Sequence, residues 1–310
     1  MDHNNPFSRG FSRAELCLLA SALLVVAALI LVLFHVLDIR KGVNKWMNFH
    51  LSLNQDSDLI INYDFENPGY RAKCKGLFVP SLCNIAGNAI KGDEMRLSDG
   101  ILINSPQIKK NGRWPGKGTL RFDGQKTFVV SSGHPISDIW KTGISVMTWM
   151  RFNNLDKVQC LYGCASGLLS SKFNLYWRKR SFRSSLGGHE FSTPKLKLES
   201  GIWYHLALAV APDGLVEFYL NGKQLPFKGE NDKARLLKST CDLVIGGLCL
   251  DNSDNGITTQ TVYDEKRQHK ITVECGLRDM FEGEIDEFML YKRPLSEDDV
   301  ITHYEAGNPY

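Results

Sequence analysis

The sequence predicts an all-β sandwich that follows one long N-terminal transmembrane helix, and three observations lead to that fold class. An unbroken apolar run from Leu16 to Leu37 lies close to the N-terminus. From about Asp58 onward, short stretches of β-branched and aromatic residues are separated by Gly, Asn and Pro, which is typical of strands joined by tight turns. Hydrophobic residues make up 43% of the 310 residues. This content is sufficient for one sizeable core over the ~250 residues after the apolar run.

The apolar run is long enough to cross a membrane as a helix. About 22 residues at 1.5 Å per residue reach roughly 33 Å, which exceeds the hydrocarbon thickness of a bilayer. Only Cys17, Ser21 and His35 interrupt the run with polar atoms. A cleavable secretory signal is disfavoured, because the run is longer than a typical signal core and lacks a small-x-small cleavage site.

The flanking charges give little information on membrane orientation. Arg9 and Arg13 precede the apolar run, and Arg40, Lys41 and Lys45 follow it, so the positive charges are nearly balanced. We expect the N-terminus in the cytoplasm and the large domain outside the cytoplasmic membrane.

Cysteine usage agrees with export to an oxidising compartment. Seven of the eight cysteines follow the apolar run, and proximity alone suggests pairing Cys74 with Cys83 and Cys160 with Cys164. The connectivity remains open at this point. A zinc site is the alternative, but no C-x-x-C pair occurs in the sequence.

Eight candidate strands follow a polar stalk or linker that extends from Arg40 to Asn54. They are Leu59–Phe65, Thr119–Phe122, Thr127–Ser131, Ile144–Phe152, Trp203–Ala211, Leu215–Leu220, Leu243–Gly246 and Glu284–Tyr291. Asn221-Gly222 predicts a hairpin turn, because both residue types tolerate positive φ. Ser296 with Asp299 three residues later predicts the capped start of a C-terminal helix that stops near Gly307.

Alternation along Trp203–Ala211 divides its side chains between two faces. Tyr204, Leu206, Leu208 and Val210 lie on one face, and Trp203, His205, Ala207 and Ala209 lie on the other. We expect a strand that is buried on one side. His205 is therefore interpreted as a hydrogen-bonded structural histidine and not as a catalytic group.

The start of the chain permits two interpretations. In the first, Glu15 is the polar edge of a simple signal anchor, because a charge there reaches headgroups and water. However, Gly10-Phe11 followed by Glu15 and the apolar run resembles the type IV prepilin leader. That resemblance implies cleavage after Gly10, a methylated Phe11 as the mature N-terminus, and Glu15 as the carboxylate that pairs with a neighbouring pilin-like subunit during assembly.

Six pieces in order resemble the laminin G-like branch of the concanavalin A-like lectin/glucanase superfamily. They are Tyr63-Asp64-Phe65, residues 118–124, Val146-Met147-Thr148-Trp149, residues 201–207, residues 218–223 and residues 283–296. The resemblance implies a two-sheet jelly-roll sandwich. Modules of this type mostly bind glycans or proteins, in some cases with calcium.

Glucanases of this superfamily carry an E-x-D-x-E or E-x-D-x-x-E motif. Glu284-Ile285-Asp286 begins such a motif, but Phe288 and Met289 stand where the second glutamate belongs. Alternation places Glu287 on the face opposite to Asp286. No G-x-S-x-G, P-loop or H-E-x-x-H motif occurs either. We therefore expect no enzymatic activity.

Two binding candidates remain. The oxygen-rich segment around Asp251 and Asp254 is a weak candidate for calcium, with a solvated turn as the alternative. The second is a basic cluster with interleaved aromatic residues, for which a charged hairpin tip is the simpler interpretation. It comprises Tyr176, Trp177, Arg178, Lys179, Arg180 and Arg183. Trp114, Trp140 and Trp177 are aromatic residues that are able to stack on sugars if exposed.

The sequence thus predicts a leader at residues 1–10, a transmembrane helix and stalk at 11–54, and a laminin G-like sandwich at 55–310. The predicted function is that of a non-catalytic, pilin-like or pseudopilin-like membrane protein that displays a recognition domain for a glycan or protein. Expected partners are the lipid bilayer and other pilin-like subunits, without specific nucleic acid and without a required cofactor. The alternatives are an uncleaved single-pass surface protein or an unusual glycoside hydrolase.

Overall fold

The computed structural model divides the chain into two compact units, Met1–Met47 and Asn48–Tyr310. The structure describes residues 12–53, 55–66, 81–82, 84–86, 99–131, 139–164, 173–229, 233–236, 242–250, 258–264 and 269–309.

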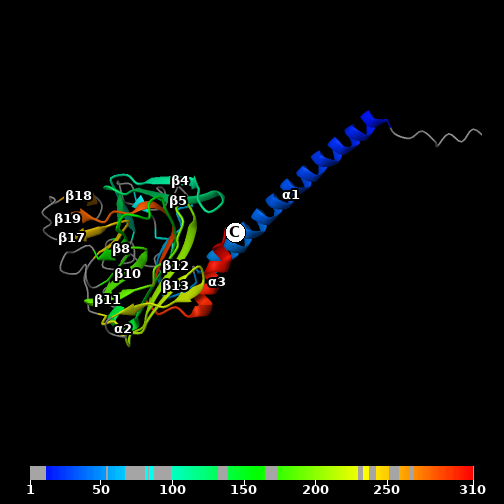
Figure 1. The fold of residues 1–310 in the computed structure, drawn as a ribbon. Helices are drawn as coiled ribbons and strands as arrows, with labels where there is room; N and C mark the ends of the chain where they lie inside the picture. Colours follow the sequence, from blue (N-terminus) through cyan, green and yellow to red (C-terminus); the bar gives the residue numbers. More distant parts are fainter. Residues whose placement is uncertain are drawn as a thin grey trace, which may run out of the picture. The chain divides into compact units, whose positions relative to one another are not determined.

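The first unit consists of most of α1 (Arg13–Leu53), drawn in blue in Figure 1. By length and composition this helix is able to cross a membrane, as an anchor or as a signal sequence. The side chains of the apolar run are exposed within the unit, for example Leu24 at 73%. The segment predicted as a stalk continues the helix through Gly42 without a break.

A reciprocal pair of hydrogen bonds begins α1. The Ser12 backbone N–H donates to Glu15 Oε2 at 2.7 Å, and the Glu15 N–H donates to Ser12 Oγ at 3.3 Å. This is a capping box, which satisfies two of the backbone donors that the first turn leaves open. Glu15 therefore has a local structural role, while its role in assembly stays a prediction.

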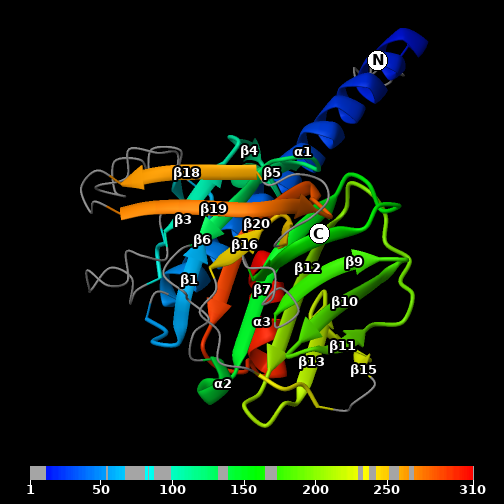
Figure 2. The ribbon, with the colours of Figure 1, turned by 90° about the vertical axis from the view of Figure 1, so that its left-hand side faces the viewer.

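The second unit is built on two antiparallel sheets that form a sandwich (Figures 1 and 2). The first sheet has, in spatial order, β14 (Lys223–Leu225), β13 (Val216–Leu220), β12 (Trp203–Val210), β7 (Ile144–Phe152), β20 (Glu282–Tyr291), β5 (Pro115–Asp123) and β4 (Gln107–Asn111), and β1 (Leu59–Tyr63) also pairs with β20.

The second sheet and a smaller one complete the strands. The second sheet has the order β15 (Lys228–Gly229), β11 (His189–Ser192), β10 (Ser181–Leu186), β9 (Asn174–Arg178), β8 (Gln159–Cys164), β16 (Leu243–Ile245), β6 (Phe128–Ser131), β3 (Gly100–Ile103) and β2 (Ser81–Leu82). The smaller sheet has the order β17 (Leu248–Leu250), β19 (His269–Arg278) and β18 (Thr258–Asp264). The described part of this unit also contains the helices α2 (Ile139–Thr142) and α3 (Glu297–Gly307).

The main core lies between the two large sheets. From β12 it receives Tyr204, Leu206, Leu208 and Val210, the set that alternation assigned to one face. Ala207 points the other way into a second apolar cluster, which contains Leu53, Met147, Leu295 and Val300. All of β12 is consequently buried. The expectation of one-sided burial was wrong, because α3 and the last turn of α1 cover the outer face of this part of the sheet.

The predicted turn and cap are confirmed. Leu220 pairs with Lys223, which leaves Asn221 and Gly222 as a two-residue turn with φ of 52° and 74°. Ser296 is the N-cap of α3, and its side chain and that of Asp299 form both bonds of a capping box.

One suggested cysteine pair is wrong. Cys160 is buried and free, whereas Cys164 forms a disulfide. The two lie on the same strand, β8, where an extended backbone carries them apart. Cys17 is also free, and the other suggested pair, Cys74 with Cys83, lies outside the described residues.

Candidate functional site

A β-bulge in β20 brings two acidic residues to the same side of the first sheet. Asp286 is opposite Trp149 and Phe288 is opposite Thr148, so Glu287 is an extra residue in the ladder, with φ of 56°. Both carboxylates contact the Arg113 guanidinium, Asp286 Oδ2 to Nε and Glu287 Oε2 to Nη2, each at 2.7 Å. The expectation that Glu287 faces away from Asp286 was wrong, because it assumed a regular strand.

Lys117 from β5 completes a buried ion network. Its Nζ lies 2.7 Å from Asp286 Oδ1, donates to the Asp64 carbonyl at 2.9 Å, and also pairs with Glu66. The side chains of Arg113, Lys117, Asp286 and Glu287 are all at most 1% exposed. Buried charges at this depth are tolerated only as compensated pairs.

The network holds its charges through mutual attraction. Burial alone would raise the pKa of Glu287, but Arg113 and Lys117 lower it to about 2. Burial likewise acts to lower the pKa of Lys117, yet Asp286 and Glu287 raise it above its ordinary value. The arrangement is therefore one of charge compensation between fixed groups.

The remaining acid of the partial glucanase motif is also bound. Glu284 Oε2 lies 2.6 Å from Arg151 Nη2, and the Glu284 side chain is 10% exposed. A glycosidase needs one carboxyl group free to hold a proton and a second carboxylate free to act on the substrate. Here Glu284, Asp286 and Glu287 each contact a cation, which suits a structural role.

Two histidines lie beside this network. His205 Nε2 is 2.9 Å from His303 Nδ1, and His303 Nε2 is 3.2 Å from Met289 Sδ. Both rings are buried, which lowers the pKa of His303 to about 4 and that of His205 well below its ordinary value. His205 thus has the structural surroundings that the sequence suggested. Its pairing with His303 of α3 was not predicted, since the two are far apart in sequence.

The structure separates the predicted basic cluster into three parts. Trp177 is 1% exposed and its Nε1 donates to the Leu155 carbonyl, so it belongs to the core and is no sugar-stacking surface. Tyr176 and Arg183 both reach Glu190 on β11, with Oη–Oε1 at 2.9 Å and Nη1–Oε2 at 3.8 Å. The three residues that remain, Arg178, Lys179 and Arg180, are exposed at the turn between β9 and β10.

Two further cations lie near that turn and were not predicted. The Leu196 N–H donates to the Arg180 carbonyl at 2.7 Å, which brings the exposed Lys195 and Lys197 next to the hairpin. The alternating Lys-Leu-Lys pattern was the available signal, since it places one apolar residue inward between two outward cations.

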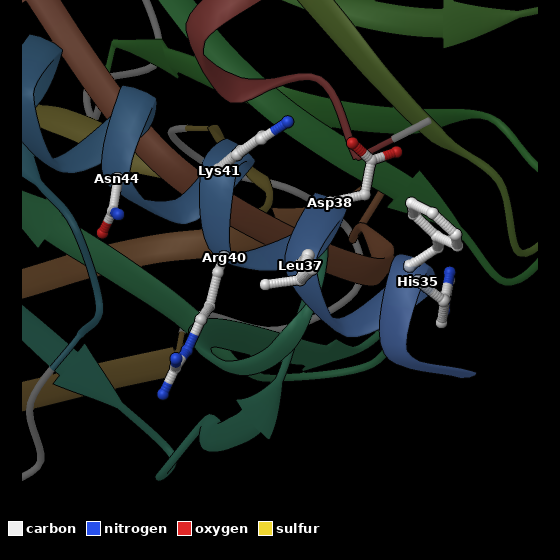
Figure 3. A pocket seen from close by; sticks show the side chains of 7 residues that line it. His35, Leu37, Asp38, Arg40, Lys41 and Asn44 are labelled. Atoms are coloured by element: carbon white, nitrogen blue, oxygen red, sulfur yellow. The ribbon is translucent and has the colours of Figure 1, made fainter. Parts of the chain in front are cut away.

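The described hollows add no further site. One of about 180 Å³ is lined by Phe49, Leu53, Met147, Tyr291, Arg293 and Asp299, among others. Arg293 is engaged there by Asp299 at 2.8 Å and Asp56 at 3.1 Å. The hollow in Figure 3 is lined only by residues of α1, at the point where the apolar run ends at Leu37 and the polar residues Asp38, Arg40 and Lys41 begin.

Several predicted residues lie outside the described part of the chain, namely Gly10, Phe11, Asp251 and Asp254. Trp140 is 41% exposed, and Lys141 Nζ lies 5.1 Å from the centroid of its ring. Among the described side chains, no three His, Cys, Asp or Glu residues form a group suited to a metal ion.

Comparison with known proteins identifies the fold and no family. No family model and no curated protein sequence matches the chain. The binding domain of Paraclostridial Mosquitocidal Protein 1 is similar over 81% of this chain and 52% of its own, with a TM-score of 0.50 and 14% identity. The botulinum neurotoxin serotype D/C binding domain is similar over 82% of this chain and 53% of its own, with a TM-score of 0.52 and 10% identity. The second unit is a jelly-roll sandwich. This chain spans about half the length of either solved domain.

Proposed function

We propose that this protein is a non-catalytic membrane-anchored recognition protein, in which the apolar helix holds a jelly-roll domain that binds a glycan or a protein. The observation that carries the proposal is the combination of α1, an apolar helix of membrane-spanning length, with a sandwich similar to two toxin binding domains. The similarity concerns the fold, and the toxins' own receptors are not transferred.

The absence of catalysis is part of the proposal. It is supported by Glu284, Asp286 and Glu287, whose carboxylates are each engaged by Arg113, Lys117 or Arg151. The domain also works without a required cofactor, so its binding is expected to persist in a metal chelator. Calcium-dependent binding would point to the segment around Asp251 and Asp254.

The finer proposal concerns the anchor. We propose a prepilin-like protein that is cleaved after Gly10, methylated on Phe11 and assembled through Glu15, with its domain outside the cytoplasmic membrane. It is supported by the leader sequence and by the helix start, because the capping box of Ser12 and Glu15 begins α1 directly after Phe11. An uncleaved single-pass surface protein is the alternative.

The direct test is binding of the full chain in detergent to an array of neutral and acidic glycans and of surface proteins. Retention on at least one glycan or protein class, without release of cleaved sugar, is expected. Release of sugar products would contradict the non-catalytic proposal. Failure to bind any glycan or protein on the array would contradict the recognition function.

A further inference from the structure

The hairpin between β9 and β10 ends in a cluster of exposed cations, here called the basic tip. It is formed by Arg178, Lys179, Arg180, Lys195 and Lys197. The hydrogen bond from the Leu196 N–H to the Arg180 carbonyl ties the two segments together at 2.7 Å. Leu196 packs against the main core. The cations are therefore presented on a backbone that is fixed on both sides of the tip.

The turn geometry does not account for the residues that occupy it. Arg178 pairs with Ser181, so Lys179 and Arg180 form a two-residue turn with φ of 52° and 63°. Positive φ is strained for residues other than Gly and Asn, and this turn type strongly favours Asn-Gly. Two other two-residue turns of the described chain, Asn221-Gly222 and Gly187-Gly188, meet the same requirement with glycine or asparagine. Lys-Arg at the β9–β10 turn is thus less stable than Asn-Gly would be. The presence of two cations at this turn therefore needs an explanation other than stability.

The positive charge of the basic tip is largely uncompensated. Within the described part of the chain, no carboxylate forms an ion pair with any of its five members. Arg178 is close enough to Asp279 to act, together with Arg278, against the burial that raises the pKa of that acid. Like charges held together repel, and an anionic partner relieves that repulsion.

The surroundings decide between classes of anionic partner. Trp177 is buried, Tyr176 is half-buried with its hydroxyl bound to Glu190, and none of the five members is aromatic, so the described residues of the tip offer little surface on which nucleic acid bases stack. Its five exposed members include no apolar side chain for insertion into a bilayer. What remains is recognition of anionic groups by charge and by the guanidinium forks of Arg178 and Arg180, which suit carboxylate and sulfate oxygens.

We propose that the basic tip binds an acidic polysaccharide, which carries sulfate or carboxylate groups along its chain. This inference rests on the proposed function, since it names the ligand class of the recognition domain. The strained Lys179-Arg180 turn presents two of the charges, and Lys195 and Lys197 extend the contact alongside it.

The turn itself supplies a sharp variant. Lys179→Asn with Arg180→Gly removes two charges and introduces the residue pair that the turn geometry prefers. We expect the full chain in detergent to bind immobilised heparin about ten-fold less tightly at physiological salt, while its thermal unfolding midpoint stays equal or rises. The matched control is Lys109→Gln with Lys110→Gln on β4, which removes the same charge from the other sheet and should leave heparin affinity near that of the unmodified chain.

The following outcomes would contradict the inference. Equal weakening in both variants would mean that net charge alone binds heparin. Loss of binding to phosphatidylserine vesicles or single-stranded DNA, with heparin binding kept, would assign the tip to lipid headgroups or nucleic acid. If the unmodified chain binds neutral glycans or proteins but no heparin, the inference fails and the proposed function stands. If it binds none of these, both fail.

Discussion

At the scale of single residues, the buried ion network distinguishes acids that look alike in the sequence. Glu284 and Asp286 are two residues apart on β20 and each contacts a cation. Asp286 bridges Arg113 and Lys117 at 0% exposure, whereas the Arg151 partner of Glu284 is 26% exposed. Since solvent screens the second pair and not the first, the two acids differ in their contribution to stability.

The first prediction compares Asp286→Asn with Glu284→Gln. Asp286→Asn leaves two buried cations with one anion fewer and should destabilise the full chain by about 3–5 kcal/mol. Glu284→Gln, the matched control, should change stability by about 1 kcal/mol or less. The unfolding midpoints of both variants in detergent provide the measurement. Similar midpoints for the two variants would show that the network does not stabilise the fold as described.

The second prediction concerns pH and the pair of His205 and His303. The unfolded chain protonates His303 near pH 6.5, but the folded chain does so only near pH 4, so stability is complete above 6.5 and falls as the pH drops toward 4. The loss for His303 is on the order of 3 kcal/mol. Glu287 has its folded pKa lowered to about 2, so a further loss follows as the pH falls from about 4.5 toward 2.

Substitution separates these two contributions. The ionisable groups that face the pair are Arg113, His50 and Glu287. His205→Gln with His303→Gln should remove most of the pH dependence between 6.5 and 4, because neither side chain then titrates. His189→Gln on β11 should retain it. A double variant whose unfolding midpoint follows pH as steeply as the unmodified chain would refute the assignment.

At the scale of elements, the sequence predicted those whose signals are local. β7 was predicted with its correct limits, and the Asn221-Gly222 turn and the Ser296 cap were found because each depends on residues close in sequence. β9 and β10 were missed as strands, since their alternating pattern is broken by cations and serines. The pairing partners of such strands decide their conformation, and a single sequence does not contain that information.

The candidate site was harder to predict than the fold, for a physical reason. A bulge at Glu287 reverses the side-chain direction that strict alternation gives, and nothing in the local sequence marks it. The contacts of Arg113 with Asp286, 173 positions apart, follow from tertiary packing. The basic cluster was recognised as a charged segment, but only the sheet showed that Trp177 is core and that Lys195 and Lys197 adjoin the tip.

The third prediction concerns α3. Ser296 Oγ accepts from the Asp299 N–H at 3.2 Å, and Val300 of the same helix lies in the outer apolar cluster. Ser296→Ala removes this cap and should lower stability by about 1 kcal/mol. Thr302→Ala, at an exposed position of the helix, serves as the control and should be neutral or slightly stabilising. Equal midpoints for the two variants would contradict a stabilising role of the cap.

At the scale of the whole molecule, the two units imply different chemistry. α1 has an apolar surface that requires a lipid or protein environment, while the sandwich buries its apolar residues in its own core. Under the proposed function, the helix would anchor the chain and the sandwich would bind the ligand. Processing at the start of the helix would then decide whether the domain is displayed singly or as part of an assembly.

The last prediction tests processing of the anchor. Cleavage after Gly10 creates an ammonium group on Phe11, one helical turn from Glu15. Mass spectrometry of the protein from membranes of a host with a prepilin peptidase should find a chain that begins at methylated Phe11.

Glu15→Gln should then stay in the membrane but fail to co-purify with differently tagged copies, because the carboxylate that pairs with a neighbour's N-terminus is lost. Ser12→Ala, the control, weakens the same capping box and keeps the carboxylate, so it should still co-purify. A chain that begins at Met1 in that host, or a Glu15→Gln variant that assembles normally, would refute the pilin-like assembly and leave a recognition domain on a single anchor.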